Sequence, residues 1–198
     1  MFHYLKYAAY ESNKDLGTRM DKLVAARSFE TAPSILFRLC KDKDPSVREA
    51  VASNRIISKR VLNILAKDPD VLIREEVVGN PKCTSEILDK LVTDTDEIVR
   101  AKIVEHANTR KSTLRKLYND TSIEVLLRIA ESERTPVDVL DNLSYHNDKN
   151  IRLAVAGNTK IDDEIASRLV QDTDAEVRLK ALRTNRSQEI KDIFRKGI

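Results

Sequence analysis

A repeat with a constant period is the feature that most restricts how this chain folds. An arginine preceded by valine or isoleucine recurs every 26 residues, and we use it as the anchor of each repeat. The anchor stands at Arg48, Arg74, Arg100, Arg152 and Arg178, and Leu126 occupies the one remaining anchor position. The six units align without insertion or deletion. A period of this length is typical of solenoids, in which each unit buries its apolar face only against its neighbours.

Other positions of the repeat also keep their chemical character in every unit. The position nine residues before the anchor is always leucine: Leu39, Leu65, Leu91, Leu117, Leu143 and Leu169. Apolar residues also stand one residue before and three residues after the anchor, as Ile73 and Val77 do in the second unit. Agreement at this many positions is not expected by chance, so we expect these residues to form the core.

Each unit is predicted to form two short helices. The first carries apolar residues spaced for one buried stripe, such as Ile87, Leu88 and Leu91. Residues suited to a helix start precede it: Pro33, Ser58, Thr84 and Pro136. The second helix, such as residues 71–78, ends near asparagine or Gly-Asn, residues that tolerate a left-handed turn. The endings are Asn54, Gly79-Asn80 and Gly157-Asn158. Helices this short are marginal alone, so stacking must stabilise them.

The two ends of the chain depart from the pattern. We expect residues 1–198 to form one helical-repeat domain, with an N-terminal cap and a degenerate repeat in 1–32, six regular repeats in 33–186 and a C-terminal cap helix in 187–198. Arg19 lies 29 residues before Arg48, so the first unit is either degenerate or carries a small insertion. The residues expected to pack these caps are Tyr4, Tyr7 and Tyr10 at one end and Ile190, Ile193 and Phe194 at the other.

The motif in residues 68–81, DPDxx[IV]RxxVxxNP, resembles the repeat of the leucine-rich repeat variant family, and it is also similar to HEAT-type helical repeats. The resemblance extends over residues 33–186. It implies an all-α, right-handed α-solenoid (superhelix) of two-helix repeats, in which one helix layer can be 3₁₀ instead of α. Some relatives carry an iron–sulfur centre, but this chain has only Cys40 and Cys83 and no cysteine cluster.

An aspartate precedes the anchor arginine by four residues in five of the six units. The pairs are Asp44 and Arg48, Asp70 and Arg74, Asp96 and Arg100, Asp148 and Arg152, and Asp174 and Arg178. One helical turn separates the partners, so they share a face. We interpret them as a structural ladder of capping carboxylates and guanidinium groups that links each repeat to its neighbour. Where Leu126 replaces the arginine, Ser122 replaces the aspartate, which avoids an unpaired buried charge.

Two further positions are often basic. Ten residues before the anchor stand Arg38, Lys90, Lys116 and Arg168, and eight residues after it stand Lys82, Arg134, Lys160 and Arg186. Stacked repeats would turn each set into a surface stripe that tracks a phosphate backbone. The alternative is a solvated face, because 32 carboxylates balance 35 basic residues. We call these eight residues the basic columns and treat them as the candidate binding surface.

The function we expect is that of a non-catalytic scaffold, and its partner is most simply another protein. Sequence-independent binding of nucleic acid is the alternative, and a helical-repeat DNA glycosylase is a distant third. The chain has no phosphate loop, nucleophile motif, HExxH or tryptophan, so we predict no catalytic residue, metal, cofactor or small-molecule substrate. His106 and His146 fall on Asn and Asp positions of the repeat, which favours a structural role. We see no signal peptide and no membrane-spanning run, and we expect a cytoplasmic protein.

Overall fold

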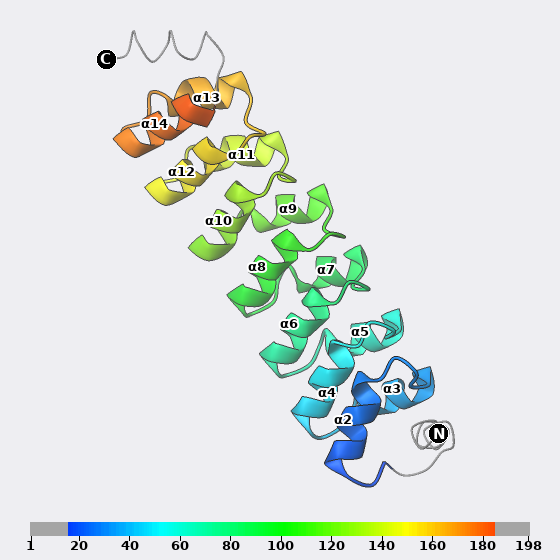
Figure 1. Cartoon of the computed structure of the whole chain (residues 1–198). Helices are drawn as coiled ribbons and strands as arrows, with labels where there is room; N and C mark the ends of the chain where they lie inside the picture. Colours follow the sequence, from blue (N-terminus) through cyan, green and yellow to red (C-terminus); the bar gives the residue numbers. More distant parts are fainter. Residues whose placement is uncertain (1–15, 185–198) are drawn as a thin grey trace. The chain divides into compact units, whose positions relative to one another are not determined.

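The computed structural model describes residues 16–184 (Figure 1). The predicted cap residues lie outside this range, as does Arg186 of the basic columns. The chain divides into two compact units, residues 1–108 and residues 109–198. We describe each unit by itself.

All thirteen helices of the described residues are α-helical, so the 3₁₀ layer allowed by the family resemblance is not found there. The first unit contains α2 (Arg19–Arg27), α3 (Pro33–Leu39), α4 (Pro45–Ala52), α5 (Lys59–Leu65), α6 (Val71–Gly79), α7 (Ser85–Leu91) and α8 (Glu97–Glu105). The second unit contains α9 (Lys111–Leu117), α10 (Ile123–Glu131), α11 (Val137–Leu143), α12 (Lys149–Gly157), α13 (Asp163–Leu169) and α14 (Ala175–Thr184). The predicted two-helix repeat is thereby confirmed.

The predicted start residues stand at the N-cap or at the first position of their helices, although the side chains of Thr84 and Pro136 make no cap hydrogen bond. Pro33 is the first residue of α3, where its missing N–H costs no hydrogen bond. The Ser58 hydroxyl accepts a hydrogen bond from the N–H of Val61 at the start of α5. The Asp70 carboxylate accepts one from the N–H of Leu72 at the start of α6. These caps explain why helices of seven to nine residues begin where they do.

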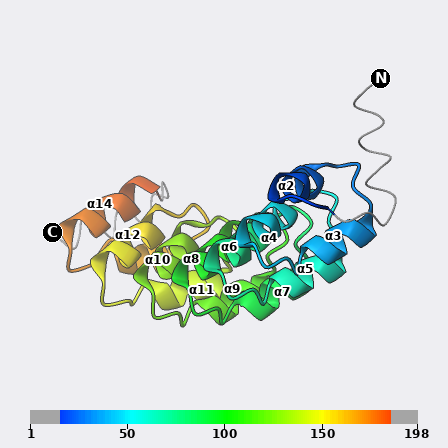
Figure 2. The same cartoon turned by 90° about the horizontal axis from the view of Figure 1, so that it is seen from below.

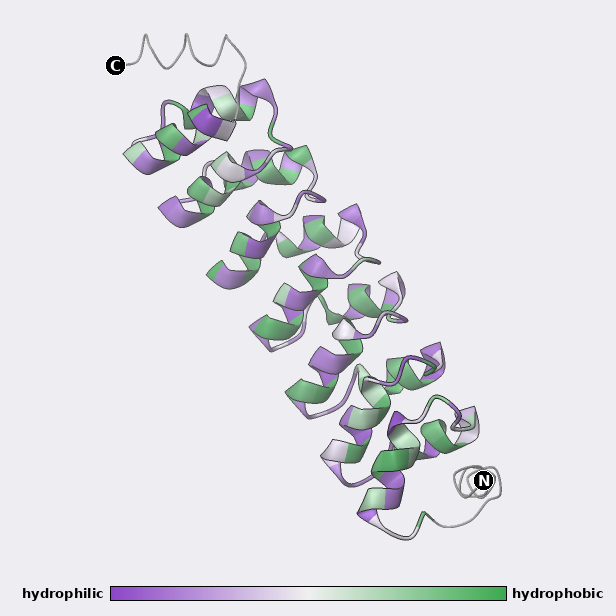
Figure 3. Ribbon diagram, viewed as in Figure 1, coloured by the Kyte–Doolittle hydropathy of each residue, from purple (hydrophilic) through white to green (hydrophobic). Residues whose placement is uncertain are grey.

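Two helix layers make up each unit (Figure 2). The second helices of successive repeats pack directly on one another, as α4, α6 and α8 do in the first unit and α10, α12 and α14 do in the second. We call α2, α4, α6 and α8, or α10, α12 and α14, the second-helix layer. Hydrophobic and hydrophilic residues alternate along the helices of both layers (Figure 3). This alternation gives every helix one face for the core.

The predicted core is confirmed. The six leucines that stand nine residues before the anchor are at most 4% exposed. The apolar residues beside the anchor, such as Ile73 and Val77, are at most 1% exposed. Cys40 and Cys83 are buried free thiols. Burial raises the pKa of the Cys83 thiol to about 12, so this cysteine stays protonated at neutral pH.

The left-handed turn that asparagine and Gly-Asn would tolerate after the second helix is not formed in the described residues. No described residue has a positive φ, and Asn80 after α6 has φ −74° and ψ 125°. Asn158 after α12 adopts the same extended conformation, with φ −79° and ψ 126°. The backbone therefore does not require asparagine at these positions. The side-chain amide does, as described below.

Candidate binding surface

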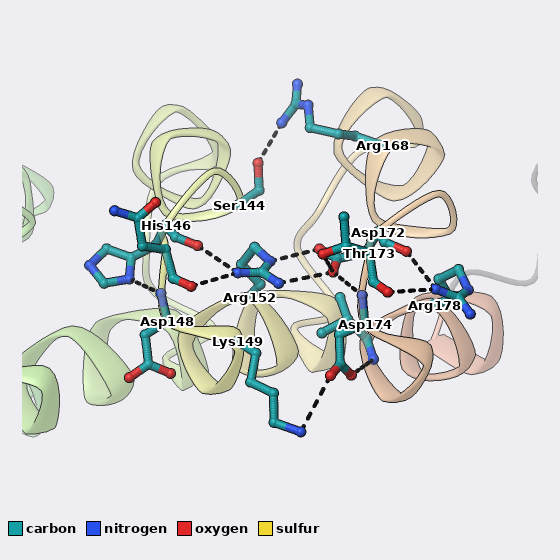
Figure 4. Close-up of polar contacts among 12 residues, drawn as sticks. Ser144, His146, Asp148, Lys149, Arg152, Arg168, Asp172, Thr173, Asp174 and Arg178 are labelled. Atoms are coloured by element: carbon teal, nitrogen blue, oxygen red, sulfur yellow. Dashed lines mark hydrogen bonds and ion pairs between the residues drawn. The ribbon is translucent and has the colours of Figure 1, made fainter.

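The anchor arginines link successive repeats. Arg48 donates from Nε to one carboxylate oxygen of Asp68 at 2.7 Å and from Nη2 to the other at 3.0 Å. Arg74 holds Asp94 in the same way, at 2.7 and 2.8 Å. In the second unit Arg152 holds Asp172 at 2.7 and 3.0 Å (Figure 4). Each bond pair is a bidentate contact between residues twenty positions apart. We call this set the Arg–Asp ladder.

The partner in this ladder differs from the one expected from sequence. The aspartate four residues before each arginine caps its own helix instead, as Asp44 does by accepting from the N–H of Ser46 at 2.9 Å. Asp70, Asp96, Asp148 and Asp174 accept in the same way from the backbone two residues further on. A cap carboxylate is already committed to its helix N-terminus, so the arginine reaches the carboxylate of the following repeat.

Lys22 makes the ladder contact in place of an arginine in the first described repeat. Its ammonium lies 2.7 Å from the Asp42 carboxylate, again twenty positions away. Lys22 also stands 26 residues before Arg48, so it occupies the anchor position. Thr18 takes the place of the capping aspartate and accepts from the N–H of Asp21. Arg19, from which the sequence suggested an insertion, instead contacts Asp44 at 2.5 Å.

Leu126 stands at the arginine position of the Arg–Asp ladder, and the residue at the matching aspartate position differs as well. The residue twenty positions after Leu126 is His146, where other repeats have an aspartate. Its Nδ1 accepts the N–H of Asp148 at 3.0 Å, as the Asp68 carboxylate accepts the N–H of Asp70. The imidazole thus keeps the turn contact and omits the negative charge that only an arginine would balance. The position corresponding to the partner of Arg178 is Ile198, outside the described residues.

A second ladder, which we did not anticipate from the sequence, runs through the asparagines after the second helices. The buried Asn80 amide donates to the carbonyl oxygens of Ala52 and Asn54 at 2.7 and 3.0 Å. Its oxygen accepts the N–H of Lys82 at 2.9 Å. Asn54 and Asn158 make equivalent contacts with the preceding repeat. We call this set the Asn ladder.

His106 follows α8 and stands at the repeat position that Asn80 has after α6. Its Nε2 lies 3.1 Å from the Asn80 carbonyl, and its Nδ1 accepts the N–H of Asn108 at 3.1 Å. The ring therefore donates to the preceding repeat and accepts from its own turn, as asparagine does. Both ring nitrogens of His106 are used structurally, and this supports the structural role predicted for it.

Two carboxylates of the Arg–Asp ladder, those of Asp94 and Asp172, have a lowered pKa and are held in the ionised form. Burial raises the pKa of Asp94, but the Arg74 hydrogen bond, the N–H of Asp96 and the charge of Arg74 together lower it below its usual value. The pKa of Asp172 is lowered for the same reasons by Arg152 and the N–H of Asp174. Side chains of these pairs are at most 14% exposed, so solvent screens them weakly.

The basic column ten residues before the anchor lies on the first helices of the repeats. Arg38, Lys90 and Lys116 are exposed on α3, α7 and α9, and Arg168 is half-buried on α13. Lys90 and Arg168 are held by contacts with their own chain. Lys90 donates to the Asn63 amide oxygen at 2.8 Å. Arg168 contacts Asp141 at 2.7 Å, binds the Ser144 hydroxyl and stacks 3.9 Å from the centre of the Tyr145 ring.

The column eight residues after the anchor lies in the loops between repeats, where Lys82, Arg134 and Lys160 are exposed. Arg134 donates from Nη2 to the Thr109 carbonyl. Arg134 and Lys160 also line one cavity, together with Lys111. The structure therefore brings two predicted residues of the second unit together, and adds one that the sequence did not single out.

Exposed apolar side chains mark another surface. Leu72 and Ile98, the second residues of α6 and α8, are 56% and 50% exposed. They occupy the same repeat position on helices that pack against each other. The sequence does not mark these two residues, because the same repeat position is Ser46 in α4 and Asn150 in α12 and keeps no chemical character along the chain.

Comparison with known proteins supports the fold. No protein-family model matches the sequence, and no curated protein matches it. A solved structure described as a leucine-rich repeat variant with a novel repetitive structural motif matches with a TM-score of 0.71 at 23% identity. The match covers 100% of this chain and 83% of that one. The resemblance seen in the repeat motif is therefore confirmed as a resemblance of fold, and the chain is an all-α repeat solenoid. No helix in the described residues is long and apolar enough to cross a membrane.

Proposed function

We propose that this chain is a non-catalytic, cytoplasmic scaffold that binds another protein through the second-helix layer of its first unit. The fold is one that generally serves as an interaction surface. The observation that carries the proposal is the exposure of Leu72 and Ile98 at one repeat position of adjacent helices. Large apolar side chains placed side by side in water favour burial against a partner.

The charge pattern supports a protein over a nucleic acid as the partner. Many exposed cations are paired with carboxylates of the chain, such as Lys102 with Glu75 at 2.7 Å and Lys59 with Glu86 at 3.2 Å. Arg115 likewise holds Asp138 at 2.7 and 2.9 Å. Binding of a phosphate backbone depends on cations that replace released counterions. Cations already balanced by carboxylates contribute less to it.

Capture from an extract of the native organism tests the proposal. The immobilised full chain is expected to retain a protein, and nuclease treatment of the extract is expected to leave that protein bound. The variant Leu72→Ser with Ile98→Ser is expected to lose it, because the exposed apolar contact is removed.

The matched control is Ile123→Ser with Leu179→Ser, which removes two residues of the second unit that are 48% and 45% exposed. It is expected to retain the captured protein. Capture that disappears with nuclease, or that survives the Leu72 and Ile98 substitutions, contradicts the proposal. Thermal melts of both variants confirm that loss of capture is not loss of folding.

A further inference from the structure

A cavity of about 520 Å³ opens in the second unit, between the loops that precede its first helices. Its lining comprises Thr109, Lys111, Glu133, Arg134, Thr135, Pro136, Val137 and Lys160. The three cations come from three successive repeats: Lys111 begins α9, Arg134 precedes α11 and Lys160 precedes α13. The cavity is thus a product of stacking, because no single repeat supplies more than one of its cations.

Two of the three cations of this cavity are not neutralised by the carboxylates around them. In the described part of the chain, neither Lys111 nor Lys160 forms a salt bridge. The Glu133 carboxylate accepts the Thr159 hydroxyl at 3.1 Å. Asp138 is bound through both oxygens by Arg115, and this hydrogen bond is the main reason why the pKa of Asp138 is lowered. Glu133 is the one carboxylate in the lining, so three positive groups face one negative group.

The cavity also has a rigid and partly apolar wall. Pro136 and Val137 form the start of α11, and Val137 is 41% exposed. The Thr135 hydroxyl donates to the Ile129 carbonyl at 2.6 Å, and Arg134 is attached to the Thr109 carbonyl. These bonds fix the wall and the guanidinium before any ligand arrives. A preorganised site loses less entropy on binding.

We infer that this cavity binds an acidic peptide segment of a partner protein. Lys111, Lys160 and Arg134 would receive its carboxylate, and Pro136 with Val137 would receive an adjacent apolar side chain. The inference rests on the proposed function and adds a second contact, with a stated chemistry, to the apolar one. A charge-assisted hydrogen bond combined with an apolar contact is a common basis for peptide recognition.

A phosphate backbone fits this cavity less well than a peptide does. Duplex DNA presents a charge about every 1.7 Å along its axis and binds through many phosphates at once. Here the cations gather around one cavity, and Arg168, on α13 beyond Lys160, is already bound by Asp141 and Tyr145. The exposed Val137 side chain offers nothing to a phosphate. A nucleic acid is therefore an outcome that the experiment must exclude.

Selection from a displayed library of random linear peptides, with the full chain immobilised, tests the inference. We expect the enriched peptides to carry aspartate or glutamate next to an apolar residue. Affinities of synthetic copies are then measured by fluorescence anisotropy. For the variant Lys111→Glu with Lys160→Glu we expect about tenfold or weaker binding, because each reversed charge repels the peptide carboxylate. Changing the acidic residue of the peptide to its amide is expected to have a similar effect.

The matched control is Lys43→Glu with Lys67→Glu, which makes the same change in net charge at two exposed lysines of the first unit that lie outside the basic columns. It is expected to bind the peptides as the wild type does. Enriched peptides without acidic residues, no saturable peptide, or equal losses in both variants would overturn the inference. Binding of duplex DNA at physiological salt that disappears only in Lys111→Glu with Lys160→Glu would also overturn the inference. The captured protein could be lost in the Leu72 and Ile98 variant and still bind Lys111→Glu with Lys160→Glu. That result would support the proposed function and refute the inference.

Discussion

Several single residues in this chain form hydrogen bonds between one repeat and the next. His106 and Asn80 differ in size and chemistry, yet both donate to the preceding repeat and accept from the backbone two residues further on. His146 and Asp68 share the second of these contacts. Histidine replaces asparagine or aspartate here because a ring nitrogen can accept at the same distance. Histidine does not reproduce the negative charge of aspartate, which an arginine of the preceding repeat requires.

The first prediction concerns this charge. Leu126→Arg is expected to destabilise the protein by about 1–3 kcal/mol, because it places a guanidinium at a position that is 5% exposed without a carboxylate to receive it. Adding His146→Asp is expected to recover part of the loss, with a coupling energy of about 1–2 kcal/mol. The measurement is a double-mutant cycle by urea denaturation.

A second cycle separates the two possible partners. Leu126→Arg combined with Ser122→Asp restores the pair spaced by four within one repeat. Since such an aspartate caps its own helix in the other repeats, we expect this cycle to show little coupling. Strong coupling to Ser122→Asp and none to His146→Asp would refute the ladder as described.

The second prediction concerns pH. A lowered pKa in the folded state means that Asp94 contributes stability above its unfolded pKa and loses it as pH falls through the folded value. Asp94→Asn is expected to cost about 2–3 kcal/mol at neutral pH, because Arg74 keeps its charge and loses its carboxylate. The difference from the wild type is expected to shrink between about pH 5 and pH 2.

Urea denaturation at several pH values measures this difference. Glu131→Gln is the matched control, because Glu131 is exposed and has no ion-pair partner among the described residues. It is expected to change stability little at any pH. A penalty for Asp94→Asn that does not depend on pH would show that the carboxylate charge is not what the Arg–Asp ladder uses.

At the scale of the helices, the sequence predicts much more of the fold than of the contacts between repeats. Period and burial are linked directly, so Leu91 and its equivalents mark the core, and Ser58 or Pro33 marks a helix start. The partner of the arginine could not be chosen in this way. In a strictly periodic chain a spacing of four and a spacing of twenty recur equally often. The one irregular unit does not decide, because both Ser122 and His146 differ there.

The Asn ladder illustrates the same limit. Asparagine after a helix suggests a left-handed residue, and nothing in the local sequence distinguishes that role from a contact with the preceding repeat. The bonds of Asn80 to Ala52 and Asn54 join residues 28 and 26 positions apart. Only the recurrence of asparagine at 54, 80 and 158 carries the signal, since a conformational role does not require one residue type.

The third prediction tests the role of this asparagine. Asn80→Ala is expected to cost about 2–4 kcal/mol, because two buried carbonyls and one N–H lose their partner. Asn80→Gly is expected to be at least as harmful, since φ there is −74° and glycine relieves no strain. Asn80→His is expected to keep part of the stability, as His106 does in its own repeat. Chemical denaturation measures all three variants.

Asn119→Ala serves as the control, because its side chain is exposed and makes no hydrogen bond among the described residues. It is expected to be nearly neutral. If Asn80→Gly were as stable as the wild type while Asn80→Ala was not, the asparagine would be conserved for backbone conformation, and the Asn ladder would be secondary.

At the scale of the whole molecule, charge decides between the two main functions. The chain has 35 basic and 32 acidic residues, and the structure shows how many of them meet in pairs across repeat boundaries. The prediction of a binding surface from the basic columns assumed that each of their cations faces solvent and has no partner within the chain. Sequence cannot show that Lys90 binds Asn63 or that Arg168 binds Asp141, because those contacts span 27 residues. Pairing reduces the positive potential that a polyanion would follow.

The last prediction therefore concerns salt. Because backbone binding releases counterions, its affinity falls steeply as salt rises, whereas a protein interface of apolar and hydrogen-bonded contacts depends on salt much less. We expect weak binding to generic duplex and single-stranded DNA at low salt and almost none at physiological ionic strength. Fluorescence anisotropy with both labelled DNAs measures this. Lys43→Glu with Lys67→Glu is the control for net charge, and Lys90→Glu with Lys116→Glu tests the column ten residues before the anchor. Submicromolar binding that persists at physiological salt and disappears only in Lys90→Glu with Lys116→Glu would make nucleic acid the partner. Such a result would show that this column binds phosphates as a stripe despite the contacts of Lys90.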